Sequence, residues 1–166
     1  MGLFNFIKNA GAKVFGPGKE TRQQTAKVEG DKDAREREEN TKAARKLEET
    51  VRDLRLEVEN LKIDIEGDMA TIRGRAQNQS TREKVILVVG NVEGISQVSD
   101  NMDVENKEPE AVFHTVETGD TLSKIAKVHY GNANRYNEIF EANKPMLSHP
   151  DKIYPGQVLR IPVQKN

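Results

Sequence analysis

The chain has 166 residues, a length that fits one ordinary domain or two small ones and excludes a large multidomain enzyme. Hydrophobic residues make up 35% of the sequence and charged residues 32%, so the core must be concentrated in part of the chain. The net charge of −1 excludes the basic balance of a dedicated nucleic-acid binder, and the lack of cysteine excludes disulfides, thiolate metal sites and cysteine nucleophiles.

The first fifteen residues, MGLFNFIKNAGAKVF, place apolar side chains three and four positions apart. This spacing predicts an N-terminal helix, and Gly11 predicts the point where it loosens. Asn5, Lys8 and Asn9 interrupt the apolar run, so it does not match a secretory signal, and no stretch approaches the roughly 18 apolar residues of a membrane span. We therefore expect a cytoplasmic protein without a transmembrane segment.

A highly charged segment follows. Residues 16–55 contain 21 of the 53 charged residues and only four large apolar side chains. Such a segment cannot form a core alone, and residues 16–39 are therefore predicted to be a charged linker or a loosely helical arm.

Residues 40–104 show the pattern of a small α+β sandwich, in the order helix, strand, strand, helix, strand. Apolar residues recur on one helical face from Ala44 to Val58, and alternation around Gly67 then predicts a hairpin. Ser80 and Glu83 are spaced as a capping box for a second helix, which should end near Gly90 and Asn91. Residues 95–104 alternate again and predict the third strand.

After a polar linker at 105–111, residues 112–163 form a second unit. The pattern predicts a strand at 112–116, a helix capped by the turn at 119–121 and closed by Gly131, a second helix ending before Pro145, and a strand at 158–161. This order is β-α-α-β, and the fold class is α+β with two small domains.

The second unit, FHTVETGDTLSKIAKVHYGNANRYNEIFEANKPMLSHPDKIYPGQVLRIP, resembles a LysM domain in its GDTL turn, its EANKP segment and its closing IYPGQVLRIP. The segment KIDIEGDMATIRGRAQNQSTREKVILVVGNVEGISQV resembles a BON domain in its hairpin, its helix and its GNVEGI loop. Together with the start MGLFNFIKNAG, the combination resembles the small bacterial potassium-binding proteins of the cytoplasm. In that family the BON part, with the N-terminal segment at residues 1–15, is associated with K⁺.

The resemblance implies an ion site made of main-chain carbonyls. K⁺ suits backbone carbonyls, and a helix C-terminus offers carbonyls without intrahelical partners at the negative end of the helix dipole. The expected ligands are the carbonyl oxygens of Ile7, Ala10, Ala12, Gly90, Val92 and Ile95. The structural alternative is that Gly90, Asn91 and Gly94 only end a helix and turn the chain. A bound ion would order the fold and change the contacts between the domains, as expected of a K⁺ sensor or buffer.

LysM domains generally bind polymers containing N-acetylglucosamine, so peptidoglycan binding is the alternative function. By the resemblance its residues would be Gly119, Asp120, Thr121, Leu122, Asn143, Pro145 and Ile153. Caps, core positions and loop prolines explain the same residues structurally. A further alternative is a scaffold that recruits a protein partner through the LysM domain or the charged arm.

An enzyme is not expected. His114, His129 and His149 do not have the spacing of a metal site, and no nucleophile elbow or phosphate-binding glycine loop occurs. His114 is expected to pack on its strand. The only cofactor expected is K⁺, and the protein is expected to be a monomer that binds no nucleic acid.

Overall fold

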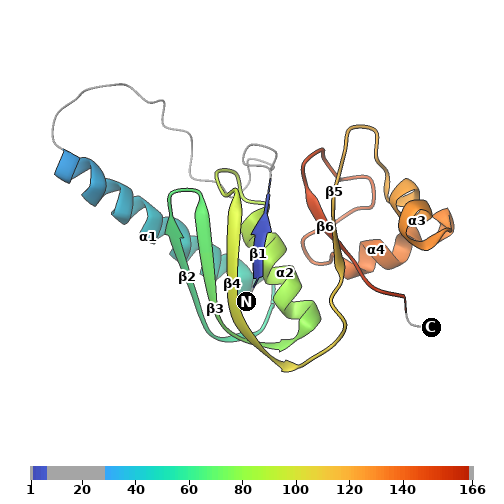
Figure 1. The fold of residues 1–166 in the computed structure, drawn as a ribbon, viewed down its shortest axis with the longest axis horizontal. Coiled ribbons are helices and arrows are strands. Elements are labelled where there is room, and N and C mark those ends of the chain that lie inside the picture. Colours follow the sequence, from blue (N-terminus) through green and yellow to red (C-terminus); the bar gives the residue numbers. More distant parts are fainter. Residues whose placement is uncertain (1, 7–28, 165–166) are drawn as a thin grey trace.

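The computed structural model describes residues 2–6 and 29–164. The elements in chain order are β1 (Gly2–Asn5), α1 (Glu29–Asp53), β2 (Val58–Glu66), β3 (Met69–Asn78), α2 (Gln79–Gly90), β4 (Gln97–Asn106), β5 (Val112–Thr115), α3 (Leu122–Tyr130), a 3-10 turn (Ala133–Arg135), α4 (Tyr136–Ala142) and β6 (Val158–Ile161). The first domain ends with β4 and the second begins with β5. The two domains lie side by side (Figure 1).

The first domain has a four-stranded sheet in the order β1-β4-β3-β2. The strand β4 pairs in parallel with β3 and antiparallel with β1. The strands alternate between buried and exposed residues, and the buried face packs against α1 and α2 in one apolar cluster. This is the α+β sandwich that the alternating and helical patterns predict.

The second domain pairs β5 with β6 antiparallel and packs α3 and α4 around its own core. Its local signals act as predicted. The Thr121 hydroxyl caps α3 by accepting from the Lys124 amide at 3.2 Å, and Gly131 ends the helix with φ +70°. Gly156, with φ +88°, closes the turn before β6.

The prediction of a helix at the N-terminus is wrong for residues 2–5, which form β1. Phe4 and Phe6 are turned toward the core, whereas Leu3 is 59% exposed, so the burial has the period of a strand. The free edge of β4 supplies the hydrogen-bonding partners, which the sequence pattern could not show. Residues 7–15 of the expected helix lie outside the described residues.

The charged arm and the first helix are one element, because α1 begins at Glu29 and not near Asn40. Residues 32–39 of this helix are exposed and strongly charged, and the Lys42 ammonium is 3.2 Å from the Glu38 carboxylate. Only its second half carries core residues, beginning at Ala44. The remainder of the predicted linker, residues 16–28, lies outside the described part of the chain.

The expected capping box is also corrected. The helix α2 begins at Gln79, and its cap is Asn78, whose side-chain oxygen accepts from the Thr81 amide at 2.8 Å. The strand β3 runs directly into this cap, so Ser80 lies inside the first turn. The Glu83 carboxylate is consequently available for another role, described below.

No helix in the described residues combines the length and apolar character needed to cross a membrane.

Candidate ion site

The C-terminal turn of α2 presents main-chain carbonyls, as the sequence analysis expects. The helix ends at Gly90, and the Asn91 amide donates back to the Leu87 carbonyl at 3.0 Å. The Ile95 amide donates to the Val92 carbonyl at 3.2 Å, and Gly94 has φ +96° within this turn. Among the described residues, no hydrogen bond ends on the carbonyl oxygen of Gly90 or Ile95. These oxygens lie at the negative end of the α2 dipole, where a cation is stabilised.

The described N-terminal residues, 2–6, lead into this turn through Phe6. The Phe6 amide donates to the Ser96 carbonyl at 2.8 Å, and the Phe6 ring lies directly against Gly90. A Cβ atom on Gly90 would be 2.1 Å from Cζ of Phe6, so the ring fits only because residue 90 is glycine. The end of β1 and the end of α2 therefore meet.

The turn is also fixed to the β2–β3 hairpin, which lies at the same end of the sheet (Figure 1). The Asp68 carbonyl accepts from the amides of Ser96, at 2.8 Å, and Gln97, at 3.2 Å, and the Asp68 carboxylate accepts from the Ser96 hydroxyl. The buried side chains of Val92 and Ile95 anchor the turn from inside. The turn is thus held by hydrogen bonds and packing on both sides.

A small cavity of about 90 Å³ borders the turn, between α1, the hairpin and residues 92–95. Its lining includes two carboxylate side chains, Glu39 and Glu93, and the amide of Asn40. Negative charge beside the turn adds to the field that favours a cation. The sequence pattern assigned Glu39 to a linker and gave no sign that α1 lies beside residues 92–95, so this contact was not predicted.

Of the six expected ligands, Gly90, Val92 and Ile95 lie together on this one turn. Ile7, Ala10 and Ala12 lie outside the described residues. Phe6 is the last described residue before them.

The second domain is hydrogen-bonded to the same turn through Asn91. The Asn91 side chain accepts from the Val158 amide and donates to the Val158 carbonyl, both at 2.9 Å. Val158 of β6 is buried in the core of the first domain, and the Phe113 ring of β5 contacts that of Phe4 with centroids 5.2 Å apart. Asn91, which lies between the expected ligands Gly90 and Val92 in the sequence, thus forms hydrogen bonds with the second domain.

A buried ion pair lies near this contact. The Glu83 carboxylate, 3.0 Å from the Arg160 guanidinium, also accepts from the Ala111 amide at 2.8 Å. Nε of Arg160 is buried without a hydrogen-bond partner among the described residues. Burial, and secondarily the charge of Arg160, lowers the pKa of the neighbouring Lys84. The interface therefore includes charged groups whose desolvation opposes docking.

The residues expected to bind glycan have roles within the LysM fold. Thr121 caps α3, and Leu122 is buried in the core. The Asn143 amide is buried, donates to the carbonyls of Ile139 and Arg160, and accepts from the Arg160 amide. The remaining members are Gly119, whose carbonyl accepts from Lys124; Asp120, which accepts from the Glu117 amide; Ile153, which packs on the core; and Pro145, in the loop after α4.

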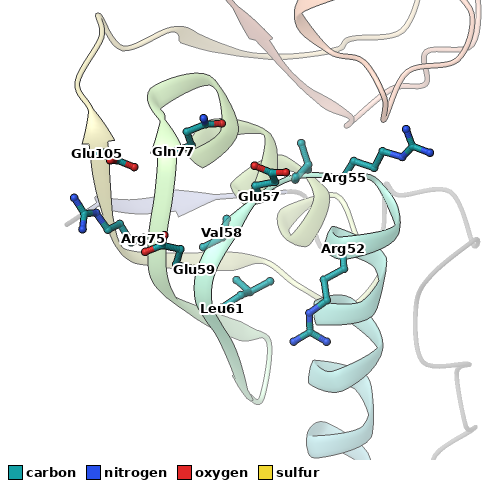
Figure 2. Close-up of a pocket in the computed structure, with 10 residues that line it drawn as sticks. Arg52, Arg55, Glu57, Val58, Glu59, Leu61, Arg75, Gln77 and Glu105 are labelled. Carbon is teal, nitrogen blue, oxygen red and sulfur yellow. The ribbon is translucent and has the colours of Figure 1, made fainter.

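Another groove, of about 580 Å³, lies at the junction of α1 with β2. Figure 2 shows the guanidinium groups of Arg52, Arg55 and Arg75 pointing in three different directions, with Glu57, Glu59 and Glu105 among them. These groups do not converge on one point. The described part of the chain also has no group of three His, Cys, Asp or Glu side chains that could hold a metal ion.

Comparisons with known proteins support the assignment of both domains. The BON domain family matches residues 39–106, and the LysM domain family matches residues 114–162. The potassium binding protein Kbp of Escherichia coli O6:H1 is 43% identical over 163 residues, which cover 98% of this chain and 99% of that protein. An uncharacterized protein of Deinococcus radiodurans is 51% identical over 49 residues, or 30% of this chain and 19% of that protein.

Proposed function

The chain belongs to the family of the potassium binding protein Kbp, with a BON and a LysM domain, and from this premise we propose that it binds K⁺ at the C-terminal turn of α2. The ligands are the carbonyl oxygens of Gly90, Val92 and Ile95, completed by those of Ile7, Ala10 and Ala12. The observation that carries the proposal is the docking of Phe6 on Gly90, which brings residues 2–6 to a helix end where no hydrogen bond from another described residue ends on the Gly90 carbonyl.

Carbonyl ligands suit a monovalent ion because they solvate it without adding formal charge. The turn is already held by the hairpin and by Phe6 through Ser96 and Gln97, so little conformational entropy is lost when the ion binds. The nearby carboxylates of Glu39 and Glu93 supply attraction without forming a dense anionic cage. The role is binding, and catalysis is not part of it.

Ion binding is coupled to domain docking in this proposal. Asn91 hydrogen-bonds to Val158 of β6 from within this turn. An ion that binds residues 90–95 in their docked geometry therefore also favours the contact with the LysM domain. The buried Glu83–Arg160 pair and the Arg160 Nε, which has no hydrogen-bond partner among the described residues, offset part of the free energy of docking. K⁺ then shifts the population toward the docked state, as a cytoplasmic sensor or buffer of K⁺ requires.

Thermal unfolding in KCl and in NaCl at equal ionic strength tests the proposal. A ligand at about 100 times its dissociation constant stabilises the bound fold by roughly 2.7 kcal/mol, which for a chain of this length is a rise in Tm of roughly 5–10 °C. Gly90→Ala should reduce this K⁺-dependent rise, because the added Cβ displaces the Phe6 ring.

Val88→Ala is the matched control on the same helix. Val88 is partly buried against the core, so its truncation lowers the stability while leaving the glycine at position 90 in place. The difference in Tm between KCl and NaCl should be unchanged in this variant. An identical K⁺ increment in the wild type, Gly90→Ala and Val88→Ala would contradict the assignment of the site, and identical melting of the wild type in both salts would contradict K⁺ binding itself.

The LysM match supports peptidoglycan binding as a second function. It predicts that the protein sediments with purified peptidoglycan or chitin regardless of K⁺. A protein that stays in the supernatant would exclude it, and a pull-down would then test the remaining alternative, a scaffold for a protein partner.

A further inference from the structure

Three side chains of the LysM domain form a row that the proposed function does not use. Nδ1 of His114, on β5, is 3.1 Å from Nε2 of His129, in the last turn of α3. Nε2 of the same His114 is 3.1 Å from the Asp120 carboxylate, in the turn before α3. The two imidazole rings meet edge to face at 88°. The row thus connects β5 to both the turn before α3 and the last turn of α3.

The hydrogen-bonding rules limit how many protons the row can hold. An ionised carboxylate only accepts, so Nε2 of His114 must carry a hydrogen toward Asp120. The contact between His114 and His129 then needs one N–H and one lone pair. Two neutral rings satisfy it, and so does a single extra proton on His114. With an extra proton on both rings, two N–H groups and two positive charges face each other, and the contact breaks.

The surroundings do not compensate a second positive charge. Asp120 is already engaged by the Glu117 amide at 2.9 Å, and this bond first, with His114 second, lowers the pKa of its carboxyl. Another charged side chain beside the row is Lys124 of α3, a cation whose ammonium donates to the Gly119 carbonyl. From β6, His114 is opposite the buried Leu159.

We propose that His114, His129 and Asp120 form a proton-responsive latch, which fastens the last turn of α3 to β5 and opens when both imidazoles are protonated. The side chains of His114 and Asp120 are 22% and 24% exposed, so protons reach the row from solvent while the imidazole contact remains mostly shielded. The latch makes the stability of the LysM domain depend on pH, independently of the ion site on the BON domain.

The sign of this dependence follows from His129. Burial, and then the charge of His114, lowers the pKa of His129 in the folded protein below its ordinary value of about 6.5. The unfolded chain therefore binds more protons, so the stability falls as the pH falls through about 6.5 and is restored above it. Each unit by which the pKa is lowered corresponds to a tenfold change in the folding equilibrium constant at low pH.

The test compares denaturant unfolding of the full chain at pH 7.5 and pH 5.0 at constant KCl. His129→Gln keeps an amide that can donate to or accept from His114 but does not titrate, whereas His149→Gln removes an exposed histidine outside the row. The folding equilibrium constants of the wild type and His149→Gln should fall several-fold more on acidification than that of His129→Gln. Equal pH dependence in all three proteins would overturn the latch.

An NMR titration of the imidazole resonances in the wild type gives a second, independent readout that does not depend on how well a variant folds. Half-protonation of His129 below pH 6.5, with the amides at the end of α3 and in β5 shifting in the same pH range, supports the latch. Half-protonation of His129 at or above pH 6.5 overturns it.

Discussion

Replacing Asn91 with alanine should loosen the contact between the two domains without disturbing the core of either. The Asn91 side chain makes two hydrogen bonds of 2.9 Å, to the amide and to the carbonyl of Val158, and Val158 is only 4% exposed. A buried main-chain group left without a partner costs about 1–3 kcal/mol. Two such groups give an upper cost of about 6 kcal/mol, but undocking lets water reach them, so we expect about 2–4 kcal/mol.

Hydrogen exchange of the Val158 amide is the most local assay for this change. A loss of 2 kcal/mol corresponds to exchange about 30-fold faster, because 1.4 kcal/mol is a factor of ten in an equilibrium constant. Asn91→Asp should protect the amide better than Asn91→Ala, because a carboxylate can still accept from it, although it places an oxygen against the Val158 carbonyl.

Asn101→Ala provides the control, since Asn101 lies on β4 and makes no cross-domain hydrogen bond within the described part of the chain. This variant should leave the exchange of Val158 unchanged. If Asn91→Ala and Asn101→Ala give the same Val158 exchange rate, the turn is not held by β6, and the proposed coupling between ion site and docking is refuted.

Two further substitutions test other contacts. Glu83→Ala should lower the free energy of unfolding by about 3–5 kcal/mol in a denaturant titration, because it leaves the Arg160 guanidinium buried without its partner, and Glu83→Gln should cost less; equal stability of Glu83→Ala and the wild type would contradict the role of the ion pair. Thr121→Ala should lower the free energy of unfolding of the LysM domain, measured by thermal denaturation, by about 1 kcal/mol through loss of the α3 cap, whereas Thr121→Ser should retain the cap. An equally large loss in the serine variant would argue against capping.

Much of the fold could be predicted because its signals are local. Gly131 and Thr121 each require only their neighbours to end or cap a helix, and both do so. The alternation around Gly67 likewise specifies a hairpin, whose strands β2 and β3 are adjacent in the chain. The end of α2 near Gly90 and Asn91 was also predicted correctly. These features depend on side-chain and backbone preferences within a few residues.

The features that failed depend on partners distant in sequence. Phe6 fits a helical face with Leu3 as well as it fits a strand face with Phe4, and the free edge of β4, more than 90 residues away, selects the strand. Glu83 fits a capping box as well as it fits a salt bridge, and Arg160 of the other domain decided its role. Sequence spacing indicates what a side chain can do locally but not which remote partner competes for it.

The candidate site shows the same division. Helix ends and glycines indicated Gly90, Val92 and Ile95, but the contact that gives residue 90 its importance, the Phe6 ring, is visible only in three dimensions. The pair of His114 and His129, fifteen positions apart, had no sequence signal because no metal or catalytic spacing describes it. A search for titratable residues at opposite ends of a short β-α unit could have suggested it.

The central claim is that main-chain carbonyls at the end of α2 bind K⁺. Anomalous diffraction near the potassium edge, from crystals of the full chain grown in KCl, locates the ion directly. One strong anomalous peak is expected within coordination distance of the carbonyl oxygens of Gly90, Val92 and Ile95, and it should be absent from crystals grown in NaCl. A potassium peak elsewhere on the molecule, or none at this turn, would contradict it.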